Sequence, residues 1–425
     1  MDTTTSEQDL RRVAVQRHLQ GERPCDICRA LGRTCPWFYK WWGEYQHDPR
    51  TDFSDHSRAP DTSPQQTSRP IERAIVSIRK AREAGRGANM KFGFIGHRTI
   101  QADLQRFGHS EVPSLSTIQR LLAKHDLTHP LGVAEETAYY PWPTAWEVNA
   151  IQATDIITRH LRGGLEIQNV HTIDHYSHAV HLTQHLDKTS DTICQHLLES
   201  WANLGLPFLH QTDNEGAFCG GHTHPRVIGK VVRLCLFCGI EPIFIPEYEA
   251  KRNYQVETFH GLWCRGFWSR CLFRGLNQVQ TQASTFVTWY HSEYCPPALA
   301  GKTPQQMRKG FQPFQLTARL QQLIPAGRLP ITAGRIHVIR KVDCQGSLTM
   351  FNETWSVHKK WIGEYVWAVI DTAKQQVDFW HLPEADADAD WIPIKTRAFE
   401  LQEPVQKLLP EFYRNRKRCR EHLPG

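Results

Sequence analysis

Residues 207–218 read PFLHQTDNEGAF, and residues 239–257 read GIEPIFIPEYEAKRNYQVE. In each stretch a short apolar run beside turn-forming residues predicts a buried strand, and the first of these strands ends at Asp213. Asn253 is of a residue type that begins helices, so Glu257 is expected in the first turn of the helix that follows. That helix has an apolar face made of Val256, Phe259, Trp263 and Phe267.

The residues before this region predict three antiparallel strands and a helix. Residues 151–161 and 165–174 flank a Gly-Gly turn, which indicates a β-hairpin, and residues 179–186 form a third strand. Thr189 can cap a helix that continues to Leu204. Three strands followed by a helix, a strand, a helix, a strand and a helix predict a mixed α/β sheet of the ribonuclease H type.

Helical spacing predicts two small modules before this sheet. Residues 1–46 contain short amphipathic segments with Gly32 at a turn, which is typical of a helix-turn-helix. Residues 47–70 are rich in Pro, Ser, Thr, Asp and Gln and are predicted to be a linker. Residues 71–130 form a second helix-turn-helix module, in which Ser116-Thr117 would begin a recognition helix. Two such modules predict recognition of an extended DNA site.

After the sheet, the sequence predicts a small β-barrel and a charged tail. Segments of residues 326–382 alternate apolar and polar side chains and are separated by short turns. Residues 383–425 start as an acidic loop with Ala-Asp alternation and end in a basic run. The chain is therefore predicted to be multidomain, with N-terminal all-α modules, a central mixed α/β core and a C-terminal barrel.

Composition favours a folded, modular protein with a polyanionic partner. The chain has 425 residues, more than one ordinary domain, and its 40% hydrophobic content is sufficient for real cores. Residues 1–130 and 313–425 carry an excess of Lys and Arg, whereas residues 131–312 carry an excess of Asp and Glu. Basic flanks suit a nucleic acid, and central carboxylates suit a metal ion. Ordinary surface charge is the alternative, because each excess is small.

Three acidic residues are expected at rigid positions near the ends of elements. Asp155 lies in the first predicted strand, Asp213 ends the fourth, and Glu257 begins a helix. Hard cations such as Mg²⁺ prefer carboxylate oxygen, and two of them can bind both the attacking and the leaving oxygens of a phosphodiester. Such a site needs carboxylates from several elements, although each acid taken singly could be an ordinary surface residue.

The order of residues in this region adds a resemblance to a known family. Thr212-Asp213-Asn214 with Gly216 and Phe218, residues 239–246, Arg252-Asn253 and Val256-Glu257 resemble the integrase catalytic core of bacterial insertion-sequence transposases and retroviral integrases. The resemblance covers roughly residues 146–313 and implies a ribonuclease H-like fold. It implies that Asp155, Asp213 and Glu257 are catalytic and bind two Mg²⁺ or Mn²⁺ ions.

The resemblance also implies a function and partners. Its members carry out metal-dependent DNA strand cleavage and strand transfer, for DNA integration or transposition. The implied partners are double-stranded DNA, as element ends and as target, and further copies of the same chain in a homo-oligomer. Since no apolar run could span a bilayer and the first ten residues are polar, we expect a cytoplasmic bacterial protein without a membrane partner, associated with the nucleoid when bound to DNA.

This chain departs from the family at two points. The family has Asn-Gly before its final acid, whereas this chain has Asn253-Tyr254, so a residue without glycine's backbone freedom stands at the turn. The interval from Asp213 to Glu257 is longer than in retroviral integrases, and residues 219–226 resemble an inserted loop. The alternative function is a catalytically inactive, transposase-derived DNA-binding protein; a ribonuclease H-type nuclease acting on RNA–DNA hybrids is a second.

Other polar residues receive structural interpretations. Asp174 competes with Asp155, but a structural hydrogen bond is its simpler role. The Cys25/Cys28 and Cys235/Cys238 pairs lie in apolar helical stripes and are expected to be buried thiols, with no disulfides in the chain. A group of histidines spans two strands without Cys partners at zinc spacing, so no zinc site is expected. These histidines are His171, His175, His178, His181 and His185.

Basic residues in the helical modules and beside the third acid are candidates for DNA contact. Lys and Arg can bind phosphates, and a recognition helix presents them to a DNA groove. A solvated surface is the alternative for each. The candidates are Arg33, Lys40, Arg120, Lys124, Lys251 and Arg252.

Overall fold

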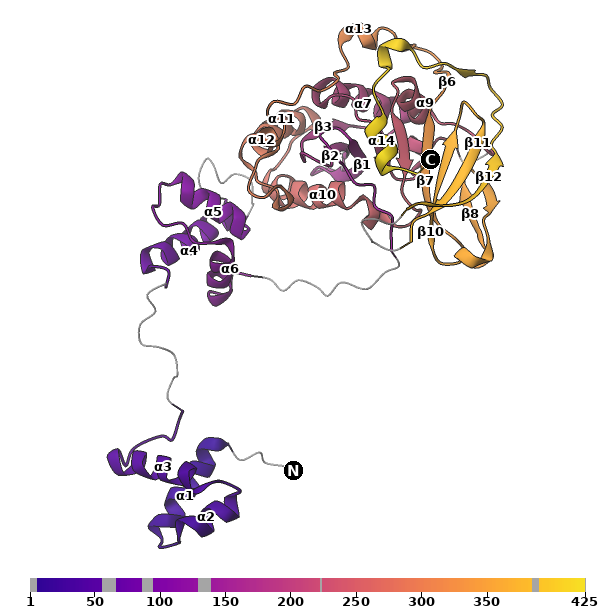
Figure 1. Ribbon diagram of the computed structural model, residues 1–425. Helices are drawn as coiled ribbons and strands as arrows, with labels where there is room; N and C mark the ends of the chain where they lie inside the picture. The colour runs from indigo at the N-terminus through magenta and orange to yellow at the C-terminus, as the bar shows by residue number, and fades with distance from the viewer. Residues whose placement is uncertain are drawn as a thin grey trace. The chain divides into compact units, whose positions relative to one another are not determined.

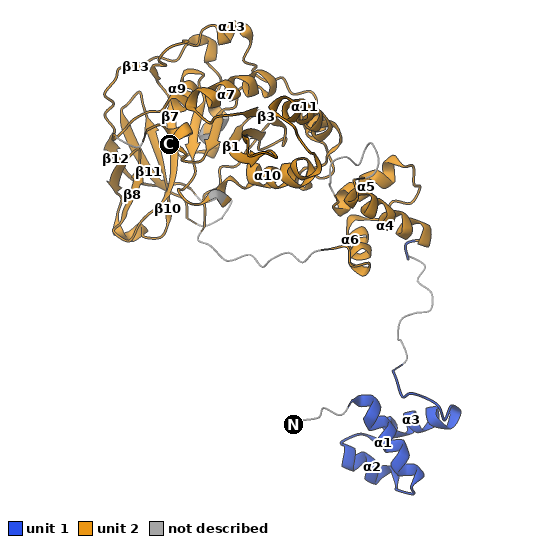
Figure 2. Ribbon diagram, turned by 180° about the vertical axis from the view of Figure 1, so that it is seen from behind, with its two compact units in different colours: residues 1–67 blue, residues 68–425 orange. Residues whose placement is uncertain are grey.

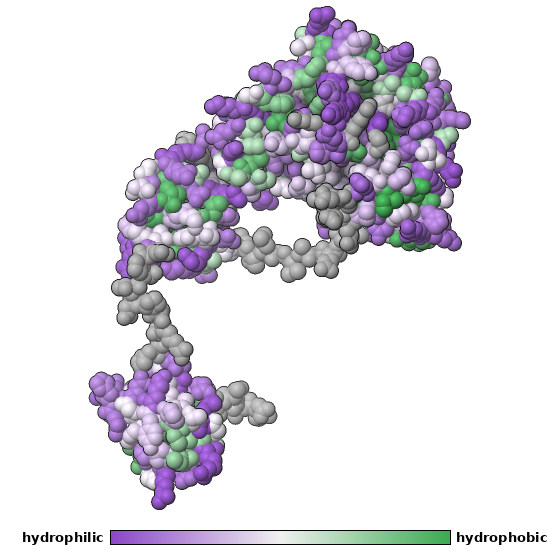
Figure 3. Space-filling model, viewed as in Figure 1, coloured by the Kyte–Doolittle hydropathy of each residue, from purple (hydrophilic) through white to green (hydrophobic). Residues whose placement is uncertain are grey.

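A computed structural model describes residues 6–55, 66–85, 95–128, 139–221, 224–383 and 390–424. The chain divides into two compact units, one ending at Thr67 and the other beginning at Ser68 (Figure 1, Figure 2). No helix in these ranges is both long and apolar enough to cross a membrane. Polar side chains cover most of the face seen in Figure 3, with smaller groups of apolar residues between them.

The first unit consists of three short helices. They are α1 (Glu7–Leu19), α2 (Pro24–Leu31) and α3 (Cys35–His47). Gly32 follows α2 with φ 63°, a left-handed backbone that favours glycine, and this turn leads into α3. Ala14, Ile27 and Phe38 form the core of the unit, one residue from each helix.

The predicted linker begins later than expected, because its first residues pack on these helices. Phe53 is buried against Val15 and Trp41, and its carbonyl accepts a hydrogen bond from Arg11 Nη1 at 2.8 Å. Arg11 also forms an ion pair with Asp55 at 2.9 Å. The remainder of the predicted linker includes residues 56–65, which lie outside the described ranges.

Three further helices follow in the second unit. They are α4 (Arg69–Glu83), α5 (His97–Arg106) and α6 (Leu115–Lys124). The start of α6 is capped by Ser114, whose side chain accepts a hydrogen bond from the Thr117 N–H, and not by Ser116 or Thr117 as predicted. A buried ion pair between Arg82 and Asp103 joins α4 to α5.

A nine-stranded mixed sheet forms the centre of the second unit (Figure 1). In sheet order the strands are β12 (Ile392–Ala398), β11 (Gln376–His381), β10 (Tyr365–Asp371), β7 (Arg335–Lys341), β5 (Glu241–Phe244), β4 (Leu209–Thr212), β1 (Ile151–His160), β2 (Glu166–Asp174) and β3 (Val180–His185). The predicted antiparallel trio is confirmed as β1, β2 and β3. β4 runs parallel to β1, and β5 runs parallel to β4.

Helices contact both faces of this sheet. The helices that contact its strands most are α7 (Ser190–Leu204), α9 (Lys230–Phe237), α10 (Tyr254–Gly266) and α11 (Leu276–Glu293). The short helices α8 (Gly216–Cys219), α12 (Pro304–Met307) and α13 (Ala318–Gln321) belong to the same unit. The predicted stripe of α10 is buried with Ala153 of β1 and Ile167 of β2, in a cluster that also contains α11. α7 and α9 belong to a different cluster, which contains Val170 of β2. Alternate residues of β2 thus face opposite helical layers.

The prediction of a separate C-terminal β-barrel is wrong. β7 pairs in parallel with β5, and β10, β11 and β12 extend the same sheet from β7. The neighbouring segments form a hairpin of β8 (Ser347–Met350) and β9 (Glu353–Ser356), and a short pair of β6 (Ile331–Thr332) and β13 (Val405–Gln406). The apolar sides of these strands share one core with α7 and α9, so no independent barrel core exists among the described residues.

The predicted basic tail is also packed on the core. Arg414 donates to the carbonyls of Leu206, Pro207 and Gly239 at 2.7 to 3.0 Å and lies over the ring of Phe208. The chain then forms α14 (Lys417–His422). The acidic Ala-Asp loop includes residues 384–389, which lie outside the described ranges.

Candidate active site

The pairing of β1 with β4 brings the first two predicted acids to adjacent strands. Ile151 pairs with Leu209 and Ala153 pairs with Gln211 in parallel register. Two residues further along this register, Asp155 of β1 is the counterpart of Asp213, which directly follows β4. Register partners in parallel strands project from the same face of a sheet.

The third predicted acid reaches this region on α10. Glu257 lies in the first turn of the helix, as predicted, and its side chain is partly exposed. Asn253 stands at the N-cap but makes no side-chain cap; its Oδ1 instead accepts a hydrogen bond from Gln211 Nε2 of β4 at 2.9 Å. This buried amide pair ties the start of α10 to the strand that leads into Asp213.

Tyr254, at the position where the sequence departs from the Asn-Gly pattern, leaves the turn unstrained. Tyr254 has φ −54° and ψ −31°, an ordinary right-handed helical conformation. A glycine is therefore not required at this position of the backbone. The departure noted in the sequence does not distort the helix that carries Glu257.

Asp155 has the most perturbed carboxyl group of the three. Burial, and next the negative charge of Asp213, raise its pKa to about 7, and the charge of Glu257 acts in the same direction. The N–H of Ile156 opposes this by donating to Asp155 Oδ1 at 2.8 Å. The three acids from β1, the end of β4 and α10 are thus close enough to interact electrostatically.

Asp213 is held by the turn that follows it. Its Oδ1 accepts a hydrogen bond from the Glu215 N–H at 3.0 Å, and burial raises its pKa. The carboxylate of Glu215, two residues after Asp213, forms an ion pair with Lys188. The Lys188 ammonium group therefore lies near Asp213.

The donor chemistry of the three acids fits a hard divalent cation. All three supply carboxylate oxygen, and a cation would relieve the mutual repulsion that contributes to the raised pKa of Asp155. Throughout the described ranges, no group of three or more His, Cys, Asp or Glu side chains is spaced to hold a metal ion as it stands. Metal binding would therefore require these side chains to draw closer together.

Sequence reasoning missed His260 as part of this group. His260 Nδ1 lies 3.7 Å from Asp155 Oδ2, and burial lowers the pKa of the imidazole to about 4. Its ring contacts that of His171, which pairs with Asp155 across β1 and β2. The available signal was helical spacing, because His260 follows Glu257 by one turn and so shares its face.

Asp174 has the structural role that the sequence analysis favoured. It is fully buried at the end of β2 and accepts hydrogen bonds from the N–H groups of Asn149 and Ser177, both at 2.9 Å. Ser177 Oγ also donates to it, and Arg308 Nη1 lies 3.6 Å away. The carboxylate closes the turn after β2.

No disulfide joins the cysteines of the described residues. Cys28, Cys235 and Cys238 are buried as predicted. The prediction is wrong for Cys25, which is exposed at the start of α2.

The basic residues beside the third acid have different environments. Lys251 is exposed. Arg252 is held by the protein: Nε pairs with Glu249 at 2.8 Å, Nη2 donates to the Tyr365 hydroxyl at 2.9 Å, and the guanidinium lies over the Tyr140 ring. The prediction of a phosphate contact is thus better suited to Lys251 than to Arg252.

The other predicted DNA-contacting residues lie on the helical modules. Lys40 is exposed on α3 beside Trp41, and Arg33 forms an ion pair with Glu7. Arg120 is exposed on α6. Lys124, also on α6, forms an exposed ion pair with Glu72 at 2.9 Å, which phosphate could displace at small cost.

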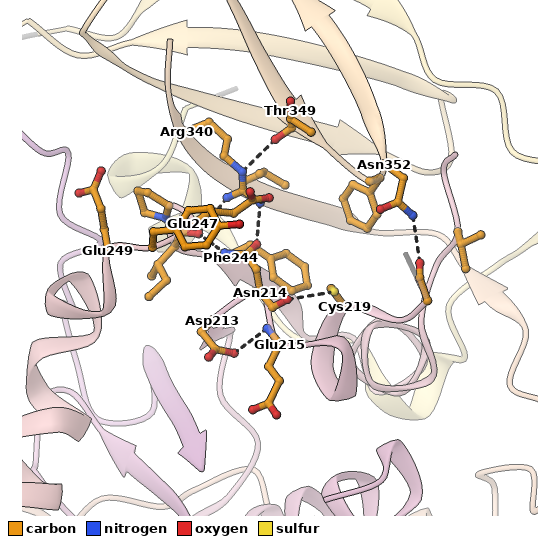
Figure 4. A pocket seen from close by; sticks show the side chains of 17 residues that line it. Asp213, Asn214, Glu215, Cys219, Phe244, Glu247, Glu249, Arg340, Thr349 and Asn352 are labelled. Atoms are coloured by element: carbon orange, nitrogen blue, oxygen red, sulfur yellow. Dashed lines mark hydrogen bonds and ion pairs between the residues drawn. The ribbon is translucent and has the colours of Figure 1, made fainter. Parts of the chain in front are cut away.

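A cavity of about 640 Å³ adjoins Asp213 (Figure 4). The loop after β4 lines one side with Asp213 and Glu215, and β7 with the β8–β9 hairpin lines another with Arg340 and Thr349. No motif in the sequence pointed to Arg340. The C-terminal strands therefore contribute directly to the surroundings of a predicted catalytic acid.

Comparisons with known proteins give remote likenesses in structure alone. No protein-family model matches the chain, and no curated protein matches it significantly. The magnesium-bound catalytic core of HTLV-2 integrase, in its dimeric form, is 18% identical with a TM-score of 0.30, covering 38% of this chain and 97% of that one. A chain of the simian T-cell lymphotropic virus intasome in complex with PP2A regulatory subunit B56 gamma is 16% identical with a TM-score of 0.35. The match covers 71% of this chain and 100% of that one. The catalytic core of BIV integrase is 14% identical with a TM-score of 0.28, covering 37% and 93%.

Two of these structural neighbours are integrase catalytic cores, and the third is an intasome. At such identities and TM-scores, they do not establish membership of a family or an activity.

Proposed function

We propose that this protein is a DNA transposase or integrase that cleaves and joins DNA strands with the carboxylates of Asp155, Asp213 and Glu257. The observation that supports this most is the placement of three acids from separate elements: the register of β1 and β4 puts Asp155 level with Asp213, and the charges of Asp213 and Glu257 help to raise the pKa of Asp155. Acids that repel one another are poor contributors to stability and good ligands for cations. Two Mg²⁺ or Mn²⁺ ions held there would supply Lewis-acid stabilisation of the reacting phosphodiester.

The three carboxylates would bind the divalent cations, and Asp155 would release a proton as they bind. With a pKa of about 7, Asp155 is partly protonated at neutral pH, so cation binding must displace that proton. Glu257 is partly exposed, which leaves its side chain room to rotate towards a cation held by Asp213. His260 is neutral at this pH and would face Asp155 without adding positive charge.

The helical modules are proposed to bind double-stranded DNA, with Arg33, Lys40, Arg120 and Lys124 as phosphate contacts and a homo-oligomer as the active form. Removing residues 1–130 should abolish specific binding to element ends and leave residues 146–424 folded, because the helices α1 to α6 have their own cores. Gel-shift titration with end DNA, alongside circular dichroism of the truncated protein, measures both effects. Unchanged affinity of the truncated protein for end DNA would contradict the assignment of DNA binding to the helical modules.

The reaction is tested with purified protein, Mg²⁺ or Mn²⁺, and DNA carrying the ends of the element that encodes the chain. Nicks that free 3′-hydroxyl groups and strands joined to target DNA are the expected products. An Asp213→Asn variant, prepared in parallel, controls for contaminating nucleases. Tight end binding with neither product would favour the alternative, a DNA-binding protein without catalysis.

A further inference from the structure

Arg340 of β7 reaches across the cavity to the loop after β4 (Figure 4). Its Nη2 donates to Asn214 Oδ1 at 2.6 Å, and its Nη1 donates to the Ile245 carbonyl at 2.8 Å. Nη1 also donates to the Ile339 carbonyl at 2.9 Å, and Nε donates to the Thr349 carbonyl at 3.0 Å. One guanidinium therefore joins the loop, the residue after β5, its own strand and the β8–β9 hairpin.

Asn214 links this guanidinium to the acid beside it. Its Nδ2 donates to the Ile245 carbonyl at 2.7 Å, so both polar ends of the amide are engaged. The residues on either side of Asn214 make the hydrogen bond that orients the acid, from the Glu215 N–H to Asp213 Oδ1. Fixing Asn214 therefore fixes the turn that aims the Asp213 carboxylate.

The side chain that makes these contacts is costly to bury. Arg340 is 8% exposed, and its nearest carboxylate, that of Glu247, is 3.7 Å away. Burial lowers the pKa of the guanidinium to about 10. A buried ion pair of this kind contributes little net stability, which suits a role in geometry. Lysine could not replace it, because three donors on one nitrogen cannot reach four acceptors spread around a planar fork.

We propose that Arg340 is a positioning residue that holds Asp213, through Asn214, in the orientation needed to bind a divalent cation. The proposal rests on the proposed function, since Asp213 must be a metal ligand for its orientation to matter in catalysis. It makes the C-terminal strands part of the active site, because the positioning side chain comes from β7. Residues that orient metal ligands typically influence metal affinity by about 10- to 100-fold.

The test compares Arg340→Lys and Asn214→Ala in the full chain, with Arg397→Lys as a matched control on the exposed side of β12. Hydrogen exchange at residues 213–216 is measured first, without metal. We expect faster exchange of the Glu215 N–H in both variants, with the rest of the sheet unchanged. Global destabilisation would instead accelerate exchange throughout β1, β4 and β5. If Arg340→Lys fails to fold, Asn214→Ala carries the test alone, because Asn214 is partly exposed.

Calorimetric titration with Mn²⁺ follows. Both variants should bind Mn²⁺ about 10- to 100-fold more weakly than wild type and the control. Their double variant should be no weaker than the worse single variant, because both changes break the same link. Unchanged exchange at residues 213–216 would overturn the positioning role. Altered exchange in a protein whose wild type binds no Mn²⁺ would refute the proposed metal chemistry and the ligand-orienting role together, while leaving the Arg340 contact established.

Discussion

At the scale of single residues, Asp213 separates binding from chemistry. We expect Asp213→Asn to keep its affinity for end DNA and to lose cleavage and joining. The amide preserves the size of the side chain, and its Oδ1 can still accept from the Glu215 N–H, but it lacks the charge that holds a divalent cation. Filter retention and strand joining measured on the same preparation test this. Joining at the wild-type rate would mean that another set of acids carries the chemistry.

The adjacent residues Lys251 and Arg252 should behave differently although both are basic. Lys251→Ala should weaken DNA binding and leave the unfolding midpoint unchanged, because the side chain is exposed. Arg252→Ala should destabilise the protein by about 1–3 kcal/mol, because it removes the ion pair with Glu249, the hydrogen bond to the Tyr365 hydroxyl and the packing on the Tyr140 ring. Urea unfolding and DNA titration of the two variants form a matched pair. Equal effects on stability would contradict the distinction.

At the scale of elements, β7 decides whether the C-terminal residues are separable. An independent barrel could be deleted without harm, whereas removing residues 326–425 from this fold exposes the edge of β5 and the apolar core shared with α7 and α9. We therefore expect a chain that ends at residue 325 to be insoluble or unfolded. A chain that begins at Ser68 is the control and should remain folded. Circular dichroism and gel filtration distinguish the outcomes, and a folded, monodisperse product ending at residue 325 would contradict the shared core.

At the scale of the whole molecule, buried neutral histidines should make the protein sensitive to acid. Burial lowers the pKa to about 3 for His175 and His210 and to about 4 for His181 and His291. In the unfolded chain these groups titrate near 6.5, so between that pH and their folded pKa values the unfolded state binds more protons. The stability contributed by these neutral histidines is therefore fully present above about pH 6.5 and falls on acidification, by about 1.4 kcal/mol per pH unit for each such histidine.

Urea unfolding between pH 7.5 and 5 measures this slope. A His210→Gln variant should reduce this slope by the amount that corresponds to about one proton taken up on unfolding. His160→Gln, at an exposed position on β1, should leave the slope unchanged. A wild-type unfolding free energy that does not fall over this range would show that these histidines are protonated in the folded state.

Local patterns in the sequence were sufficient for much of the core and for the positions of the predicted acids on their elements. Alternating and helical spacing predicted β1 to β5, α7 and α10, because those periods reflect which side of each element is buried. The positions of Asp213 after a strand and Glu257 in the first turn of a helix followed from the same patterns. The structure adds that their charges act on Asp155, which the sequence could only suggest through resemblance.

Tertiary structure alone decided which strands are neighbours and which polar groups meet. The alternation in residues 335–341 predicts a strand but not its partner, and its pairing with β5 turned an expected barrel into an extension of the central sheet. That long-range pairing brings Arg340 to Asn214. Packing of α10 brings His260 to Asp155, and the neighbours of Arg252 withdraw it from solvent. Spacing along a chain encodes burial, whereas contacts between distant residues depend on how the buried faces fit together.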